Sequence, residues 1–346
     1  MATTIKDIAR MCGVGVSTVS RAINGHPDVN PVTREKILKA VEETGFTPNA
    51  SARSLKQSET NNIAILVKGY ANPFFTRMMH RMESSIAHRD CQMILRYVDN
   101  NQDEVQQAIS LCTERKLKGI IFLGGDFEHD PQELSRLEAP YIFSTTGRDR
   151  RSTSQGVDYA NVSVDDFEAS KMAVNYLIGL GNTRIGIIAE GLNIPSVGKL
   201  RFEGYKAALK ENGIPFDDSL VFEITEGLDH YTMENGYKAA KTLLRNAPDM
   251  TAVFCISDVV AIGACRAIAD NGRKIPKDIS VLGFDGIDND MYYIPRLSTV
   301  RQPVDQMAQE TVSRLFDLIE GKGKPESVLL PAELVVGEST ARRSAS

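Results

Sequence analysis

Residues 47–57, TPNASARSLKQ, lie between a short segment rich in helix signals and a long segment in which apolar runs alternate with amphipathic stretches. Pro48 fixes the start of a piece too short to be helical alone in water, since isolated helices under about 12 residues are marginal. Its small residues allow close packing against a second copy, Arg53 and Lys56 suit phosphate groups, and Leu55 is its one large apolar side chain. This pattern fits a leucine that wedges between base pairs of DNA. It also fits an isolated leucine in a solvated linker.

Length and composition bound the class of protein. A chain of 346 residues exceeds a typical single domain, so we expect one small and one large unit, or three modest units. The hydrophobic fraction of 42% supports a sizeable core, and no apolar run approaches the roughly 18 residues of a membrane span. Because the N-terminus lacks the apolar core of a signal peptide, we expect a cytoplasmic protein.

Cysteine and histidine usage gives no sign of a metal site. The five cysteines form no C-x-x-C pair, and the five histidines are scattered. We therefore expect buried thiols instead of disulfides or zinc ligands, and neither a metal nor a cofactor.

Charge is distributed unevenly along the chain. Residues 1–60 hold eight Lys plus Arg against six Asp plus Glu, so the totals of 40 and 45 leave 32 against 39 for the remainder. The head is therefore about +2 and the body about −7. This asymmetry suits a nucleic-acid-binding head on an acidic body, although a head this mildly basic falls short of the usual basic footprint.

The first residues predict two short helices joined by a tight turn. Thr4 followed by Asp7 is a capping-box pattern ahead of a helix over residues 5–11. Gly13 interrupts the helical pattern, and a second helix is expected over residues 16–24. Two short helices around a glycine turn are typical of a helix-turn-helix.

A third helix follows. Asn30 as N-cap and Pro31 at the first helical position start it, and Gly45 ends it. The shared core is expected from apolar residues of the three helices: Ile8, Ala9, Val14, Val19, Ile23, Ile37, Ala40 and Val41.

The second helix exposes a face that suits base recognition. Val16, Ser17 and Arg21 lie on that face, near the helix N-terminus from which side chains reach base edges in the major groove. Arg21 suits a bidentate contact to guanine. The alternative for Arg21 is a solvated surface arginine.

From residue 62 onward the pattern is that of a parallel sheet with crossover helices. Strands are expected at residues 63–67, 92–97, 119–123, 141–143, 184–189, 252–256 and 280–283. Helices are expected at residues 74–89, 103–115, 167–178, 199–212, 232–244 and 259–271. Two similar βα halves imply two lobes, and ligands bind at the carboxyl ends of such strands, between the lobes.

Four side chains are candidates for ligand contact in that position. Arg201 and Asp285 follow or end strand-like segments, and a donor fork paired with an acceptor suits sugar hydroxyls. Phe74 and Tyr231 offer flat faces for an apolar ring surface. Simple core packing is the alternative for Phe74.

Several stretches resemble the lactose-repressor family of bacterial transcription regulators. In the first 57 residues they are residues 4–9, 13–14, 17–24, 33–36 and 48–55. In the body they are residues 72–75, 201–205, 283–285, 297–303 and 335–340, together with Asp258, Ala261 and Gly263. The resemblance implies a helix-turn-helix DNA-binding domain over residues 1–47, a hinge helix and linker over residues 48–60, and a two-lobed effector-binding and dimerisation domain over residues 61–346. The implied body is an α/β fold like that of periplasmic sugar-binding proteins, with two lobes joined by three strand crossings.

The resemblance also implies site residues. Those for DNA are Val16, Ser17, Thr18, Arg21, Asn24, Asn49, Ala52, Arg53, Leu55 and Lys56, with Leu55 as the wedge in the minor groove. Those for the effector are Phe74, Phe75, Thr145, Arg201, Tyr231, Ser257 and Asp285.

Four positions depart from the family pattern. Gly15 stands where a serine touching a phosphate is usual, and Gly337 stands where an arginine is common. Thr145 replaces an acidic residue, and Ser257 replaces an asparagine of sugar-binding members. The changes at Thr145 and Ser257 leave the effector open, and Arg148, Arg150 and Arg151 leave room for a phosphorylated sugar.

Other functions fit less well. The chain has no G-x-x-x-x-G-K-[ST] loop, no H-E-x-x-H and no nucleophile elbow, so we expect no enzyme. A solute-binding protein with the same body is the main rival, but it would need no helix-turn-helix. The sequence therefore predicts a homodimeric repressor of transcription that binds a palindromic double-stranded operator and is controlled by a small polar ligand, most simply a sugar or a sugar derivative.

Overall fold

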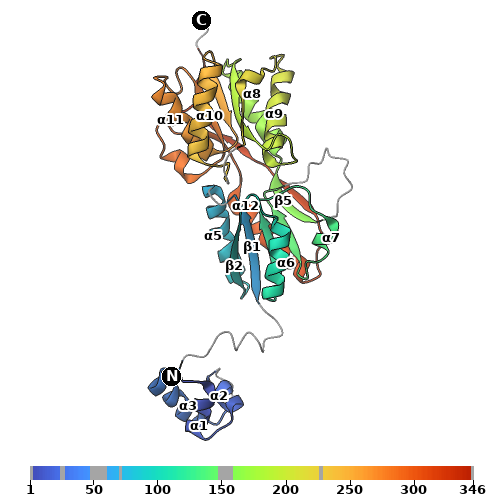
Figure 1. Ribbon diagram of the computed structural model, residues 1–346, viewed down its shortest axis with the longest axis vertical. Coiled ribbons are helices and arrows are strands. Elements are labelled where there is room, and N and C mark those ends of the chain that lie inside the picture. The colour runs from blue at the N-terminus through green and yellow to red at the C-terminus, as the bar shows by residue number, and fades with distance from the viewer. Residues whose placement is uncertain are drawn as a thin grey trace. The chain divides into compact units, whose positions relative to one another are not determined.

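The computed structural model describes residues 3–23, 28–46, 61–69, 72–146, 159–225 and 229–343 (Figure 1). The chain divides into two compact units, residues 1–60 and residues 61–346. The predicted hinge, residues 48–57, lies outside the described residues.

The small unit contains three helices: α1 (Ile5–Cys12), α2 (Val16–Ile23) and α3 (Pro31–Thr44). The predicted capping box is present, because the Asp7 amide donates to the Thr4 hydroxyl and the Thr4 amide donates to the Asp7 carboxylate at 3.0 Å. Gly13 ends α1 in the left-handed conformation, with φ of 66°. These local signals place α1 and α2 as the helix-turn-helix pattern predicts.

The third helix and the core of this unit also follow the sequence. The side-chain oxygen of Asn30 accepts from the amides of Val32 at 2.9 Å and Thr33 at 3.4 Å, and Gly45 ends α3 with φ of 59°. The fully buried apolar residues of the unit come from all three helices and the segment before α3: Ile8, Ala9, Cys12, Val19, Ala22, Val29, Ile37 and Ala40. Val14, Ile23 and Val41 pack at the margin of this core.

The large unit has two lobes, each built on a six-stranded sheet. In the first lobe the order is β11-β5-β4-β3-β1-β2, and every pairing is parallel. Its strands are β1 (Asn62–Lys68), β2 (Gln92–Val98), β3 (Gly119–Leu123), β4 (Tyr141–Ser144), β5 (Ala160–Val164) and β11 (Ser327–Leu330).

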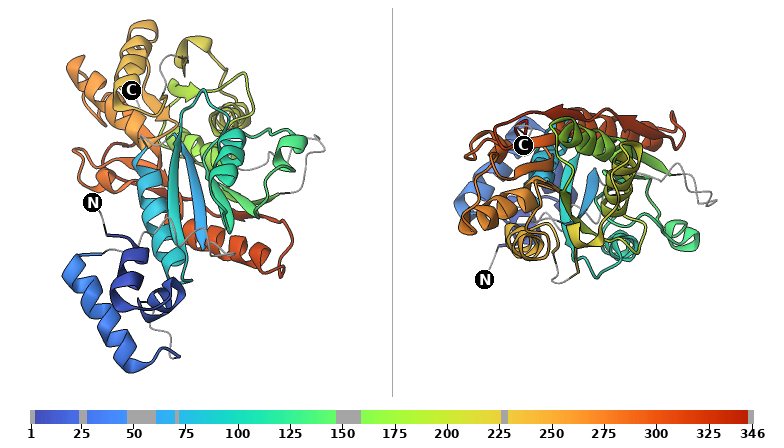
Figure 2. Two further views of the ribbon diagram at one scale, coloured as in Figure 1. Left: turned by 60° about the horizontal axis from the view of Figure 1, so that its bottom comes forward. Right: turned by 90° about the horizontal axis from the view of Figure 1, so that it is seen from above.

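Helices cover both faces of the first sheet. Ile63, Ile65 and Val67 of β1 pack on the side of α5 (Pro73–Ala87) and α12 (Val304–Ile319). The alternate residues of β1 pack on the side of α6 (Glu104–Glu114) and α7 (Pro131–Leu134). Figure 2 shows α5 and α12 close together, in agreement with their direct packing. A strand buried on both faces is a continuous apolar run.

The second lobe has the order β12-β10-β9-β8-β6-β7, parallel except for the β10–β12 pair. Its strands are β6 (Ile185–Glu190), β7 (Val221–Ile224), β8 (Ala252–Cys255), β9 (Ser280–Asp285), β10 (Ser298–Arg301) and β12 (Glu333–Val335). Its helices are α8 (Asp166–Gly179), α9 (Val197–Glu211), α10 (Met233–Asn246) and α11 (Asp258–Asp270), with short 3-10 turns η1 (Asp218–Leu220) and η2 (Asp288–Met291). The α8–α9 and α10–α11 pairs pack tightly.

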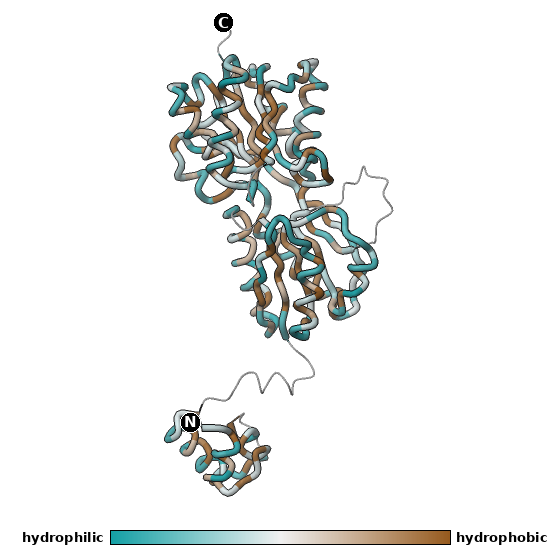
Figure 3. Tube along the Cα trace, in the orientation of Figure 1, coloured by the Kyte–Doolittle hydropathy of each residue, from teal (hydrophilic) through white to brown (hydrophobic). Residues whose placement is uncertain are grey.

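The chain crosses between the lobes three times, after β5, after β10 and after β11. Seven of these α-helices and strands were not predicted from the sequence: α7, α12, β5, β7, β10, β11 and β12. In β5 the buried polar residues Asn161 and Ser163 break the apolar run, which explains why that strand was missed. Figure 3 shows the apolar residues of each lobe concentrated on the central strands. Within the described ranges, no helix is long and apolar enough to cross a membrane.

Candidate functional site

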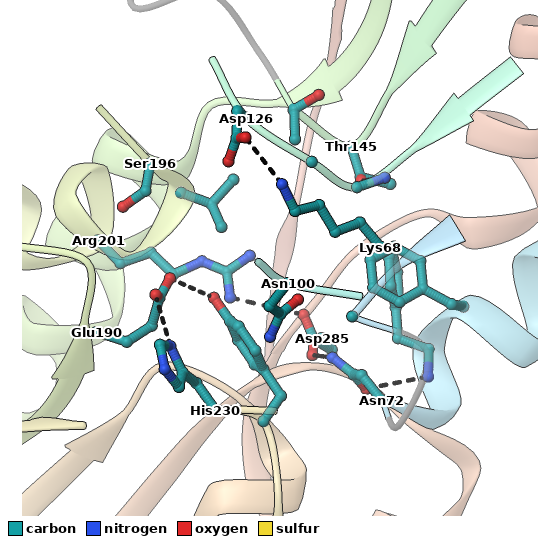
Figure 4. A pocket seen from close by; sticks show the side chains of 18 of the residues that line it. Lys68, Asn72, Asn100, Asp126, Thr145, Glu190, Ser196, Arg201, His230 and Asp285 are labelled. Carbon is teal, nitrogen blue, oxygen red and sulfur yellow. Dashed lines mark hydrogen bonds and ion pairs between the residues drawn. The ribbon is translucent and has the colours of Figure 1, made fainter. Parts of the chain in front are cut away.

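A cavity of about 180 Å³ lies between the two lobes of the large unit, at the carboxyl ends of their strands (Figure 4). Six of the seven effector residues expected from the sequence belong to its lining: Phe74, Phe75, Thr145, Arg201, Tyr231 and Asp285. Parallel strands of both lobes end here, which is where open α/β sheets bind ligands.

Asp285 connects the two lobes at the floor of this cavity. Its carboxylate accepts from Asn72 Nδ2 of the first lobe at 2.7 Å and from Gln302 Nε2 at 2.8 Å. Burial raises the pKa of Asp285, while Arg201 and the two amide donors act in the opposite direction. Its φ of 117° lies in the region that favours glycine, as does the φ of 72° at Thr145. Strained residues of this kind cluster at functional sites.

Arg201 is buried on α9 behind Asp285. Its Nε donates to Asp166 Oδ1 at 2.8 Å, and its Nη1 donates to the Ile256 carbonyl and lies 3.8 Å from Asp285 Oδ1. The guanidinium stacks on the Phe284 ring, 3.7 Å from the ring centre. Burial raises the pKa of Asp166 to about 6, against the opposing influence of Arg201.

Lys68 supplies a second cation, from the end of β1. Its Nζ lies 3.0 Å from Glu104 Oε2 and 2.8 Å from Asp126 Oδ2. Burial acts to lower the pKa of Lys68, but the two carboxylates outweigh it and the pKa is raised. Lys68 is therefore a charged donor facing the cavity from the first lobe.

Glu190, at the end of β6, accepts hydrogen bonds on the second-lobe side of the cavity. Its carboxylate accepts from Tyr231 Oη at 2.9 Å and lies 3.4 Å from His230 Nδ1. The hydrogen bond to Glu190 raises the pKa of His230. Burial raises the pKa of Tyr231 well above its usual value, so the phenol remains a donor.

Two of the seven expected effector residues, Ser257 and Phe74, have structural roles in addition to or instead of lining the cavity. Ser257 is not in the lining, because it is the N-cap of α11 and its Oγ accepts from the Val260 amide at 3.3 Å. Phe74 lines the cavity and also belongs to the hydrophobic core, packing edge-on against Phe75 with ring centres 5.5 Å apart. Core packing and ligand contact are thus compatible at Phe74.

Sequence reasoning did not single out Lys68, Asn72, Glu190, His230 or Gln302 as site residues. The signal for Lys68 and Glu190 was available, since each is the charged last residue of a buried strand. For Asn72 the sequence indicates a helix cap, and the structure shows a second role. Its Oδ1 accepts from the Phe74 amide at 3.1 Å at the start of α5, while its Nδ2 donates to Asp285. No group of three potential metal ligands occurs in the portion of the chain that the structure describes.

The small unit presents the expected DNA-reading face of α2. Val16, with 41% of its surface exposed, Ser17 and Arg21 face solvent, and Thr18 is half-buried. Arg21 forms an ion pair with Asp28, and both side chains are about half exposed. The other expected DNA residues lie outside the described ranges: Asn24, Asn49, Ala52, Arg53, Leu55 and Lys56.

Comparison with known proteins identifies the family. The model of bacterial regulatory proteins of the lacI family matches residues 4–49, and that of the periplasmic binding protein-like domain matches residues 174–340. The transcriptional regulator MalR of Clostridium butyricum is 39% identical over 345 residues, covering 97% of this chain and 98% of MalR. This chain belongs to the LacI family.

Solved structures of LacI-family members share the complete fold. A complex of the regulator CelR with cellobiose is 28% identical, with a TM-score of 0.72 over 97% of this chain and 99% of CelR. The Lac repressor dimer bound to operator and an anti-inducer is 25% identical, with a TM-score of 0.76 over 99% of this chain and 100% of the repressor. The predicted fold class, a helix-turn-helix domain followed by a two-lobed α/β domain, is confirmed.

Family membership also decides the class of function. The chain is a DNA-binding transcription regulator, because its relatives along the full length are helix-turn-helix regulators and the lacI family model covers α1 to α3. The rival prediction, a solute-binding protein without a DNA role, leaves this helical unit unexplained.

Proposed function

We propose that this LacI-family regulator is a repressor whose binding to a palindromic operator is controlled by a small polyhydroxylated ligand in the interlobe cavity. The observation that carries this proposal is the convergence of donors and acceptors from both lobes on one cavity. A ligand that contacts Lys68 in one lobe and Glu190 or Asp285 in the other changes the free energy of lobe closure. A ligand shifts a conformational equilibrium only by such differential contacts.

The chemistry of the lining favours hydroxyl groups. Each hydroxyl both donates and accepts a hydrogen bond, and the cavity offers carboxylates beside ammonium, guanidinium and amide donors. The rings of Phe74 and Tyr231 suit the apolar face of a sugar ring. A carbohydrate is bound by the relative CelR, whose complex holds cellobiose. We assign no catalytic role to any residue of this site.

The proposed DNA contacts fall into two groups. Val16, Ser17 and Arg21 read base edges in the major groove, with Thr18 and Asn24 beside them. In the segment of residues 48–57, Leu55 wedges into the minor groove, and its flanking residues contact the DNA backbone: Asn49, Ala52, Arg53 and Lys56. A palindromic operator has two half-sites, so two copies of the chain, with their hinge segments side by side, are proposed to bind it.

Self-association is proposed through an apolar surface of the second lobe. Tyr292 and Ile294 are 86% and 90% exposed, and Met291 beside them is half exposed. Tyr292 also borders a recess lined by Met233, Ile262 and Tyr293 together with Asp288 and Asn289, so exposed apolar side chains of two elements lie close together. Contiguous exposed apolar residues mark protein interaction sites. A twofold dimer matches a palindromic operator, since protein and half-site symmetry coincide.

Two measurements on the full chain test this proposal together. Binding-site selection from random duplex DNA is expected to return a sequence with two inverted half-sites. A thermal-shift screen of sugars, sugar phosphates and nucleobases is expected to give a sugar that raises the melting temperature and alters operator affinity in a gel-shift titration. A nucleobase as the only hit, lost in Asp285→Ala, would keep the cavity and refute the sugar. A sugar hit that is unchanged in Asp285→Ala would refute the cavity.

A further inference from the structure

Each cationic side chain that the structure describes in the lining of the interlobe cavity is paired with carboxylates of the protein itself. Among the lining residues that the structure describes, the cationic side chains are Lys68, Arg201 and, when protonated, His230. Figure 4 shows each of them turned toward an acidic side chain. The number of acidic partners decides how much positive charge is left for a ligand.

Lys68 is shared by two carboxylates. Glu104 Oε2 lies 3.0 Å from Nζ and is almost fully buried, whereas Asp126 Oδ2 lies 2.8 Å from Nζ and its side chain is 54% exposed. The Glu104 carboxylate is itself fixed, because it accepts from the Asp126 amide at 2.7 Å. The local charge of this group is one cation against two anions.

Arg201 is also shared by two carboxylates, Asp166 at 2.8 Å and Asp285 at 3.8 Å. Its Nη1 also donates to the Ile256 carbonyl, and one face of the guanidinium packs on the Phe284 ring. Because Nε and Nη1 already have protein partners, each bidentate edge of the guanidinium has one nitrogen engaged, which weakens the bidentate binding of a phosphate that makes arginine effective.

His230 faces the fifth carboxylate, Glu190, 3.4 Å from Nδ1. Among the residues that the structure describes, three cations, with His230 counted as protonated, stand against five carboxylates, of which Glu104 and Asp166 are outside the lining. This leaves two negative charges in the described part of the site. With His230 neutral, three negative charges remain.

We propose that this cavity selects an uncharged polyhydroxylated ligand and rejects the phosphorylated form of the same ligand. The inference rests on the proposed function, since it names the effector class of that same cavity. A phosphate group brings about 1.5 to 2 negative charges at pH 7. It meets described side chains whose net charge is negative once Glu104 and Asp166, which pair with Lys68 and Arg201 from outside the lining, are included, so like charges repel. A hydroxyl brings no charge and finds a donor in Lys68 next to an acceptor in Asp126.

Titration calorimetry on the full chain tests the discrimination with matched pairs of probes. The pairs are ribose and ribose 5-phosphate, glucose and glucose 6-phosphate, fructose and fructose 6-phosphate, and cellobiose and its 6′-phosphate. In any pair that binds, the neutral sugar is expected to bind at least about tenfold more tightly. A phosphate ester that binds as well as its sugar, or better, overturns the inference but keeps the cavity as a sugar site. Binding by none of the eight probes counts against the sugar assignment of the proposed function and against this inference with it.

A pair of charge-neutralising variants separates the electrostatic cause from a steric one. Asp126→Asn removes one negative charge beside Lys68 while keeping an acceptor for its ammonium group, so the affinity for a phosphate ester relative to its sugar is expected to rise about tenfold. Asp249→Asn is the control, because Asp249 is an exposed carboxylate paired with Arg184 outside the cavity lining. If the ratio of phosphate-ester affinity to sugar affinity is the same in Asp126→Asn as in Asp249→Asn, the inference is wrong.

Discussion

At the residue scale, Arg21 carries two competing interactions. The guanidinium proposed to bind a guanine is paired with Asp28 of the same unit. Exposed pairs contribute about 0.2–1 kcal/mol, so Asp28→Asn is expected to raise operator affinity by up to about fivefold. Arg21→Ala is expected to cost about 1–3 kcal/mol and to relax the preference at one position of each half-site.

Gel-shift titrations with the selected operator and its single-base variants measure both effects. Glu35→Gln on α3 is the control for Asp28→Asn, because it removes the same charge from an exposed position of the same unit. Equal gains from Asp28→Asn and Glu35→Gln would mean that the pair with Asp28 does not restrain Arg21.

His230 is expected to make stability depend on pH. Glu190 raises the pKa of His230 above the 6.5 of the free side chain, so the folded state binds the proton more tightly than the unfolded state. The resulting stabilisation is complete below pH 6.5 and is lost as the pH rises through the folded pKa. Melting temperatures of the parent and of His230→Gln, measured from pH 5.5 to about 9, should therefore converge with rising pH. A constant difference across that range would show that the pair contributes nothing.

At the element scale, α5 joins the two lobes through one of two adjacent arginines. Arg77 and Arg81 both bind Asp305 on α12, but only Arg77 reaches Asp288 of the second lobe, with Nη1 3.2 Å from Oδ1. The two side chains thus form a natural comparison. Arg77→Ala is expected to change ligand affinity about two- to fivefold, because it removes a contact between the lobes.

Arg81→Ala is expected to leave ligand affinity unchanged, since its partner lies in the same lobe. Calorimetric titration of the parent and both variants with the sugar that the screen returns measures the difference. An identical response of the two variants would place the effect in α5–α12 packing instead of lobe closure.

The segment of residues 48–57 is the other element with a separable prediction. Leu55→Ala is expected to weaken specific operator binding strongly while leaving the melting temperature of the body unchanged, because a wedge acts only in kinked DNA. Lys56→Ala is expected to lower affinity for all sequences and to reduce the salt slope by about one. Titrations at several salt concentrations distinguish the two, and parallel behaviour of both variants would refute the division into wedge and phosphate contact.

At the scale of the whole molecule, the exposed apolar surface around Tyr292 is the proposed interface between two copies of the chain. Tyr292→Asp places a charge in the centre of that surface and is expected to convert a dimer into monomers, with operator affinity falling at least about tenfold. Sedimentation velocity and gel-shift titration measure the two results. Val336→Asp, at an exposed apolar position outside the recess, is the control. A dimer that persists in Tyr292→Asp would place the interface elsewhere.

The sequence by itself determined the local structure, because its signals act within a few residues. Thr4 with Asp7, Asn30 with Pro31, and Gly13 and Gly45 specify where helices begin and end through short-range hydrogen bonds and backbone preferences. The apolar runs likewise predicted four strands of the first sheet and three of the second, since most of these strands are buried on two faces and have no polar alternation. Six of the seven expected effector residues line the cavity because ends of parallel strands meet there.

Only the tertiary structure decided which distant charges meet. Lys68 with Asp126, Asn72 with Asp285, and Glu190 with Tyr231 are each separated by tens to hundreds of residues, and no spacing rule links them. The placement of β5, α12 and β11 also depends on chain crossings that local patterns do not encode. Ser257 illustrates the limit, since the same residue type at a strand end serves as a helix cap once α11 begins there. The sequence supplied the side chains of the site, and their pairing followed from how the two lobes pack.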